Sequence, residues 1–193
     1  MRSSNGSDTE VRPRALVVYE SMFGNTEAVA KAVALGLAHD FDVDLTECGS
    51  APSPVPDDVA LLVVGAPTHA FSLSRAGTRD SARQQASSTA RPSEFGVREW
   101  LDGLDRKLQG TGATQLVAAA FDTKVAHPRL PGSAARAAAK KLHRLGLRAV
   151  VSPKTFLVEG TEGPLVEGEA DAAFRWGRGL AGACLSSRSS ASR

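Results

Sequence analysis

The chain has 193 residues, of which 42% are hydrophobic and 23% charged, as expected for a single globular domain. No stretch approaches the ~18 consecutive apolar residues of a membrane span, and the polar start MRSSNGSDTE is not a secretory signal. The net charge of +2 arises from the terminal segments, so we expect no nucleic-acid partner and no membrane association. Cys48 and Cys184 have no metal-ligand spacing, and we expect two free thiols in a cytoplasmic protein.

Short apolar runs and helical patterns alternate along the chain. We expect strands at 15–19, 41–45, 59–64, 115–121 and 148–158, and helices at 26–37, 95–104, 133–145 and 169–184. Because strands alternate with helices, the sequence predicts a three-layer α/β/α sandwich around a five-stranded parallel sheet. Residues 14–184 would form this domain, and the polar segments 1–13 and 185–193 would be disordered tails.

The turn after the first strand is the clearest functional signal. Residues 21–26 lead directly into a helix, whose free N–H groups and positive dipole end form an anion site. The hydroxyls of Ser21 and Thr26 and the amide of Asn25 can surround a phosphate without any Lys or Arg. This composition favours a single phosphomonoester over the P-loop or the Gly-x-Gly-x-x-Gly dinucleotide turn. The alternative is that these residues only cap the helix.

Residues 17–33, VVYESMFGNTEAVAKAV, resemble the opening signature of the flavodoxin family at every constrained position. The resemblance extends over residues 14–183 and implies a strand order of 2-1-3-4-5 with FMN at the switch point between the first and third strands. It places the phosphate on the first turn, at Ser21, Met22, Phe23, Gly24, Asn25 and Thr26.

Two further loops carry the isoalloxazine ring in the flavodoxin family. Here they correspond to residues 65–72 and 121–128, after the third and fourth strands. The resemblance assigns flavin contacts to Pro67, Thr68, His69, Ala70, Phe71 and Ser72, and to Phe121, Asp122 and Thr123.

The aromatic residues depart from the family pattern. Many flavodoxins hold the ring between a Trp and a Tyr, but the only Tyr, Tyr19, ends a strand here. Trp100 and Trp176 lie on predicted helices, where we expect them to be core or surface-packing residues. Ring contacts would then come from His69, Phe71 or Phe121, with Phe71 the best candidate for stacking.

Residues 71–93 show no apolar period, and a loop of this length is usually functional or mobile. We expect a flap beside the flavin. Its four arginines, with Asp80 as the one acidic residue, would attract an acidic partner or an anionic substrate: Arg75, Arg79, Arg83 and Arg91.

The resemblance implies an electron carrier that works between a flavin reductase or ferredoxin reductase and an acceptor redox protein. We expect a monomer. One alternative is an FMN-dependent quinone or porphyrinogen oxidoreductase, with a flat substrate over the exposed ring. The other is a binding module that has the fold but no flavin. A nearly neutral domain would steer a charged partner only weakly.

Overall fold

The computed structural model describes residues 12–69, 71–85, 95–104, 116–127 and 131–191. Strands and helices alternate along these residues, as the sequence predicts. Their order is β1 (Arg14–Tyr19), α1 (Asn25–Leu37), β2 (Asp42–Glu47), the short 3-10 helix η1 (Cys48–Ser50), β3 (Val59–Pro67), α2 (Ala76–Gln85), α3 (Val97–Gly103), β4 (Val117–Val125), α4 (Ala134–Arg144), β5 (Arg148–Ala149), β6 (Lys154–Val158) and α5 (Glu169–Ala191).

The strands form one parallel sheet in the order β2-β1-β3-β4, and β5 and β6 both pair with the remaining edge of β4. The predicted order 2-1-3-4-5 is therefore confirmed, with two short strands sharing the fifth position. Residues 150–153 interrupt this position, and they include Pro153, which has no N–H to donate to a strand ladder.

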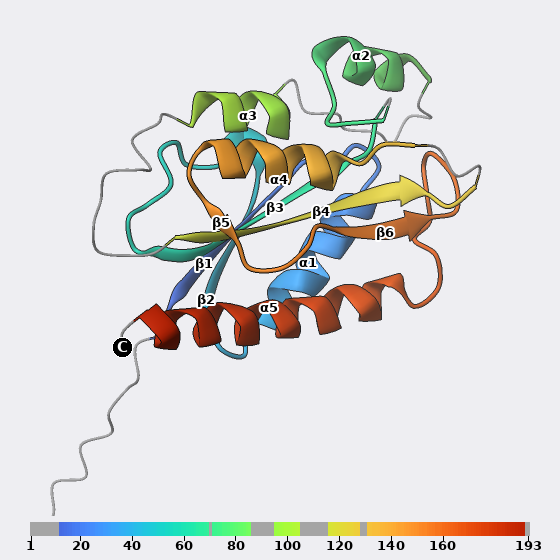
Figure 1. Ribbon diagram of the computed structural model, residues 1–193. Coiled ribbons are helices and arrows are strands. Elements are labelled where there is room, and N and C mark those ends of the chain that lie inside the picture. The colour runs from blue at the N-terminus through green and yellow to red at the C-terminus, as the bar shows by residue number, and fades with distance from the viewer. Residues whose placement is uncertain (1–11, 70, 86–94, 105–115, 128–130, 192–193) are drawn as a thin grey trace, which may run out of the picture.

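Helices cover both faces of the sheet, with α1 and α5 on one face and α3 and α4 on the other (Figure 1). Neighbouring strand residues enter different cores: Leu61 packs on the α1/α5 side and Leu62 on the α3/α4 side. Both side chains are fully buried. A strand that is buried on both faces requires a continuous apolar run, as residues 59–64 provide in β3. The predicted three-layer α/β/α sandwich is therefore confirmed.

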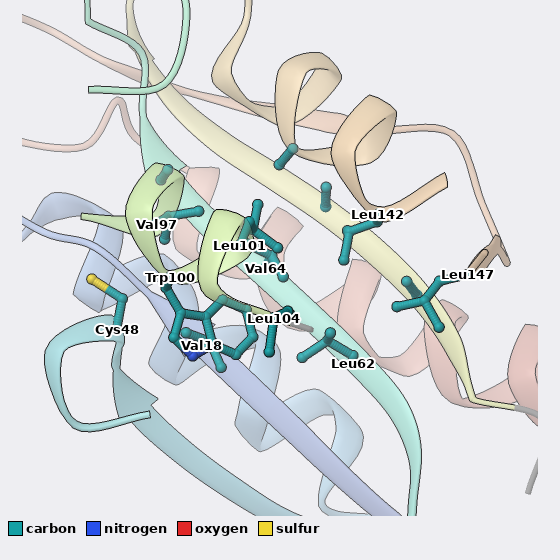
Figure 2. Packing of buried hydrophobic residues seen from close by; sticks show 14 of the residues in the cluster. Val18, Cys48, Leu62, Val64, Val97, Trp100, Leu101, Leu104, Leu142 and Leu147 are labelled. Carbon is teal, nitrogen blue, oxygen red and sulfur yellow. The ribbon is translucent and has the colours of Figure 1, made fainter. Parts of the chain in front are cut away.

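Both tryptophans pack against the two cores, as the sequence predicts, with Trp100 buried and Trp176 partly buried. Trp100 reaches from α3 toward Val18, as Figure 2 shows, and its indole donates a hydrogen bond to the Pro52 carbonyl. Trp176 on α5 lies edge-on to Phe121 and Phe156, with ring centroids 6.0 Å apart in each pair. Neither indole lies on the loops predicted to hold the ring.

The two cysteines are buried free thiols, as expected. Burial raises the pKa of Cys48 to about 12, so this thiol stays protonated at neutral pH.

The segment predicted as a structureless flap contains a helix. Helix α2 is polar throughout, AGTRDSARQQ, so it shows no apolar period in the sequence. It is held instead by Arg79, whose side chain is only 2% exposed and forms an ion pair with Glu99 on α3. Other helices dock on the domain through a stripe of apolar side chains, whereas α2 docks through the buried side chain of Arg79. Arg91 and the side chain of Arg83 lie outside the described residues.

The C-terminal segment also differs from the prediction, because α5 continues through Ala191 instead of ending at Cys184. Leu185 packs against the α1/α5 core, and the Ser187 hydroxyl donates to the Cys184 carbonyl at 2.8 Å. These contacts extend the helix into the Ser-rich sequence. Among the described residues, no helix is long and apolar enough to cross a membrane. Most of the predicted N-terminal tail, residues 1–11, lies outside the described residues.

Helices α1 and α5 cross in direct backbone contact. A Cβ atom on Gly36 would lie 2.3 Å from the Phe174 carbonyl oxygen, and one on Gly177 would lie 2.4 Å from the Val33 carbonyl oxygen. Both distances are far shorter than a carbon–oxygen contact allows, so each position requires glycine. The crossing fixes the axis of α1, and with it the turn at its N-terminus.

Candidate functional site

The turn between β1 and α1 ends in a helix N-terminus without a side-chain cap. Gly24 occupies the N-cap position in the left-handed region, with φ of 81°, where a glycine is favoured. The first helical hydrogen bond runs from the Ala28 N–H to the Gly24 carbonyl at 2.9 Å. The N–H groups before Ala28 have no acceptor within the helix and lie at its positive end, so they can bind an anion.

Ser21 supplies a further donor at this turn. Its Oγ atom is buried, and it has no hydrogen-bond partner among the described residues. A buried hydroxyl without a partner is unfavourable by about 1–3 kcal/mol, so such atoms are rare unless a ligand or water completes them. A phosphate oxygen at the end of α1 would satisfy Ser21 and the helix N–H groups together. The residues of this turn therefore fit the phosphate of FMN.

Two other predicted phosphate ligands already have protein partners. The Thr26 hydroxyl lies 2.7 Å from the Thr123 hydroxyl on β4. The Asn25 amide donates to the Glu162 carbonyl at 2.9 Å, which ties the turn to the segment after β6. When Thr123 is the donor in the hydroxyl pair, Thr26 keeps its own proton for an anion.

The loop after β3 begins with a fixed threonine. Thr68 donates from its hydroxyl to Asp122 Oδ2 at 2.8 Å and from its N–H to the Thr123 carbonyl at 2.9 Å. The same hydroxyl accepts the Ala134 N–H at the start of α4, at 2.9 Å. These bonds set the point at which the loop leaves the sheet.

His69 follows in this loop and is largely buried. Burial, and to a lesser degree the positive charge of Arg79, lowers the pKa of His69 below its ordinary value of 6.5. The imidazole is therefore neutral at neutral pH, with one donor and one acceptor nitrogen.

Phe71, the residue expected to stack on the ring, lies at the surface in this loop. Its side chain is 52% exposed, and neither Phe71 nor Ser72 lines the pocket beside Ser21. Its backbone has φ of 73°, a strained value for a residue other than glycine. Phe71 is therefore outside the pocket, and its stacking on the ring stays a prediction. Ala70 lies outside the described residues.

The third predicted segment belongs to a strand rather than a loop, because β4 continues to Val125. Phe121 is fully buried in the α1/α5 core, where its ring covers Gly65, and it does not line the pocket beside Ser21, so its contact with the flavin stays a prediction without support from this position. Asp122 is also fully buried, and its Oδ2 accepts hydrogen bonds from Thr68, from the Ser133 hydroxyl and from the Ala135 N–H. Its role is to join β4 to α4.

The predicted residues that come together form one pocket of about 170 Å³ at the switch point between β1 and β3. Those lining it from the first turn are Ser21, Met22, Phe23, Asn25 and Thr26, and from the later segments Pro67, Thr68, His69 and Thr123.

Four further residues line the pocket: Lys124 and Val125, which lie in the predicted 121–128 loop but had no assigned contact, and Val158 and Thr161, which sequence reasoning missed. Val125 is in register with Val158, so the ends of β4 and β6 form one wall together. Lys124 donates to the Gly132 carbonyl at 3.0 Å. The signal that could have identified these residues was the full length of β4, which polar Asp122 and Thr123 conceal in the sequence.

Comparison with known proteins identifies the fold. No protein-family model matches the chain, and no curated protein matches its sequence. A flavodoxin from the domain Archaea superposes with a TM-score of 0.60 at 18% identity, covering 89% of this chain and 98% of the other. Oxidised Flavodoxin 1 from Bacillus cereus gives a TM-score of 0.58 at 16% identity, covering 85% of this chain and 94% of the other.

A flavodoxin, WrbA-like protein from Agrobacterium tumefaciens is similar to the same degree, with a TM-score of 0.59 at 17% identity over 90% of this chain and 98% of the other. The chain therefore has the flavodoxin-like fold.

Proposed function

We propose that the protein binds FMN in this pocket and serves as an electron carrier. The observation that carries the proposal is the buried, unpartnered Ser21 hydroxyl beside the uncapped N-terminus of α1. These donors converge on one anion, as a terminal phosphomonoester requires. When bound, FMN would supply the redox chemistry, and the protein would set its position and environment.

The position of the pocket also supports FMN, because it lies at the carboxyl ends of the strands, where an open α/β sheet binds its ligand. With the phosphate at the first turn, the flavin ring would extend from the pocket toward the surface. A ring at the surface can exchange electrons with another protein without entering the core.

Titration of the apoprotein with FMN, FAD and riboflavin, followed by flavin fluorescence, tests the cofactor. We expect FMN to bind more tightly than FAD, and riboflavin to bind at least about tenfold more weakly than FMN because it lacks the phosphate. Tighter binding of FAD, or equal binding of riboflavin and FMN, would contradict the proposal.

The proposed partners are a flavin reductase or ferredoxin reductase as donor and a redox protein as acceptor, with the carrier a cytoplasmic monomer. Stopped-flow mixing of the FMN-loaded protein with a ferredoxin reductase and NADPH measures the first half-reaction. Reduction of a quinone with NADPH in the absence of any second protein would identify an oxidoreductase instead, and would reject the carrier function.

A further inference from the structure

The N-terminal turn of α3 anchors the strand end that precedes the phosphate turn. Glu20, which directly precedes Ser21, is fully buried, and its Oε2 accepts the Val97 N–H at 2.9 Å. The adjacent Gly96 N–H donates to Glu99 Oε2 at 3.1 Å, which closes the first turn of α3. The start of α3 is thus fixed relative to the end of β1.

Arg98 projects from this fixed turn onto the chain that follows the second loop. Its Nε donates to the Ser74 carbonyl at 2.9 Å, and its Nη2 donates to the Leu73 carbonyl at 2.7 Å. A longer contact of 3.4 Å joins Nη2 to the Ser72 hydroxyl. Leu73 and Ser74 are 1% and 0% exposed. The planar guanidinium therefore holds three consecutive residues in one orientation, which a single ammonium group cannot do.

The residues held by Arg98 lead directly to the pocket wall. Ser72 and His69 exchange two backbone hydrogen bonds of 2.9 Å each, so the position of one sets the position of the other. Phe71, with its φ of 73°, lies between them. A strained residue of this kind persists only where the surrounding contacts over-determine it. The bonds from Arg98 to Leu73 and Ser74 supply that constraint on one side.

Arg79 reinforces the same segment from α2. Its guanidinium donates to the Ser74 hydroxyl at 2.8 Å and to Glu99 Oε2 at 3.2 Å. Ser74 is therefore bonded to two arginines, one through its carbonyl and one through its side chain. Because Arg79 also forms the ion pair with Glu99, and its charge acts on His69, its removal would change several interactions at once. Arg98 is the cleaner probe.

We infer that Arg98 is a positioning residue for the half of the site that would hold the isoalloxazine ring. It does not line the pocket, and it acts through Ser72 on His69. The phosphate half depends on the N-terminus of α1 and is not bonded to Arg98. The inference rests on the proposed FMN function for the identity of the ligand, whereas the effect on the loop follows from the contacts alone.

The loop itself is tested without flavin, by amide hydrogen exchange in the apoprotein. In Arg98→Ala, the Ser72 and His69 amides should exchange about tenfold faster or more, since the constraint on their paired hydrogen bonds is lost. Arg98→Lys should restore part of the protection. Arg144→Ala, an exposed arginine at the end of α4, is the matched control and should leave both amides unchanged. Unchanged exchange in Arg98→Ala would overturn the inference.

Ligand binding then separates the two halves of the site. For Arg98→Ala, riboflavin affinity should fall by about tenfold, while affinity for inorganic phosphate stays within about twofold of the wild type. A parallel loss of both affinities would show general destabilisation and overturn the positioning role. If the wild type binds neither FMN nor riboflavin, the proposed function fails, and the exchange experiment still decides whether Arg98 fixes the loop.

Discussion

The Thr26 hydroxyl lies 2.7 Å from the Thr123 hydroxyl, so the first turn of α1 is bonded directly to β4. Thr26 is 2% exposed and Thr123 is 5% exposed. Each hydroxyl can donate and accept, so the two hydroxyls satisfy one another in the apoprotein. The hydroxyl that accepts in this bond keeps its own proton, which it can donate to an anion. Thr26 therefore belongs both to the framework of the apoprotein and to the predicted phosphate site.

Thr26→Ala should change stability as well as binding. The substitution leaves the buried Thr123 hydroxyl without its partner, so we expect the free energy of unfolding to fall by about 1–3 kcal/mol. FMN affinity should fall by roughly tenfold to a hundredfold if Thr26 also donates to the phosphate. Thr26→Ser keeps the hydroxyl and serves as the control. Urea unfolding and flavin fluorescence give the two quantities; an unchanged stability would show that the hydroxyl pair contributes nothing.

Ser21→Ala should have the opposite pattern. The Ser21 hydroxyl is buried and has no partner in the described chain, so its loss should leave the apoprotein equally stable or more stable by about 1 kcal/mol. FMN binding should weaken by about tenfold to a hundredfold, because a hydrogen bond to a charged phosphate is lost. Riboflavin binding should not change. A variant that binds FMN as the wild type does would remove Ser21 from the site.

The two arginines at the start of the polar helix should behave differently. Arg79 is buried and paired with Glu99, so Arg79→Ala should lower the free energy of unfolding by about 3–5 kcal/mol. Arg75 is exposed, and Arg75→Ala should stay within about 0.5 kcal/mol of the wild type. Chemical denaturation of the two variants side by side measures the contrast. Equal effects would mean that α2 is not held through Arg79.

Glu20 should make stability depend on pH. Burial raises the pKa of Glu20 above its ordinary value of 4.5, although hydrogen bonds from Ser74 and Val97 and the charge of Arg79 oppose the shift. The folded protein then binds more protons than the unfolded chain, so this contribution is complete below about pH 4.5 and is lost as the pH rises through the folded pKa.

Glu20→Gln removes that proton equilibrium while it keeps an acceptor for the Val97 N–H. The wild type should therefore lose stability relative to the variant when the pH is raised from about 4.5 to neutral. Glu99, which also faces Arg79, is unaltered in both proteins. Urea unfolding at the two pH values measures the difference, and a constant difference would show that Glu20 has the same pKa in both states.

Apolar patterning predicted most of the fold. In the apolar run 59–64, side chains enter the cores on both faces of the sheet, and this pattern is typical of a buried parallel strand. Helix α2 could not be found in this way, because a buried ion pair holds it and the sequence shows only a polar segment. The end of α5 was missed for a related reason: Ser187 satisfies the backbone of its own helix, which composition alone does not reveal.

The sequence predicted the candidate site best where the pocket residues are close together along the chain. Ser21 and Thr26 lie within one short turn, so their proximity follows from the sequence. Thr161 joins the pocket from a distant segment, and no local pattern connects it to that turn. Phe121 was expected to contact the flavin because the family resemblance places the third loop at 121–128. The buried bonds of the neighbouring Asp122 carboxylate, which continue the strand arrangement there, are visible only in three dimensions.

The glycine crossing of α1 and α5 has a consequence for how the protein matures in the cell. Gly36 and Gly177 lie far apart in the sequence, yet each helix lacks its closest packing surface until the other has docked. During translation α1 leaves the ribosome long before α5 is made. We therefore expect the phosphate turn to remain unformed on nascent chains, so that cofactor loading follows synthesis of α5 instead of accompanying that of the first helix.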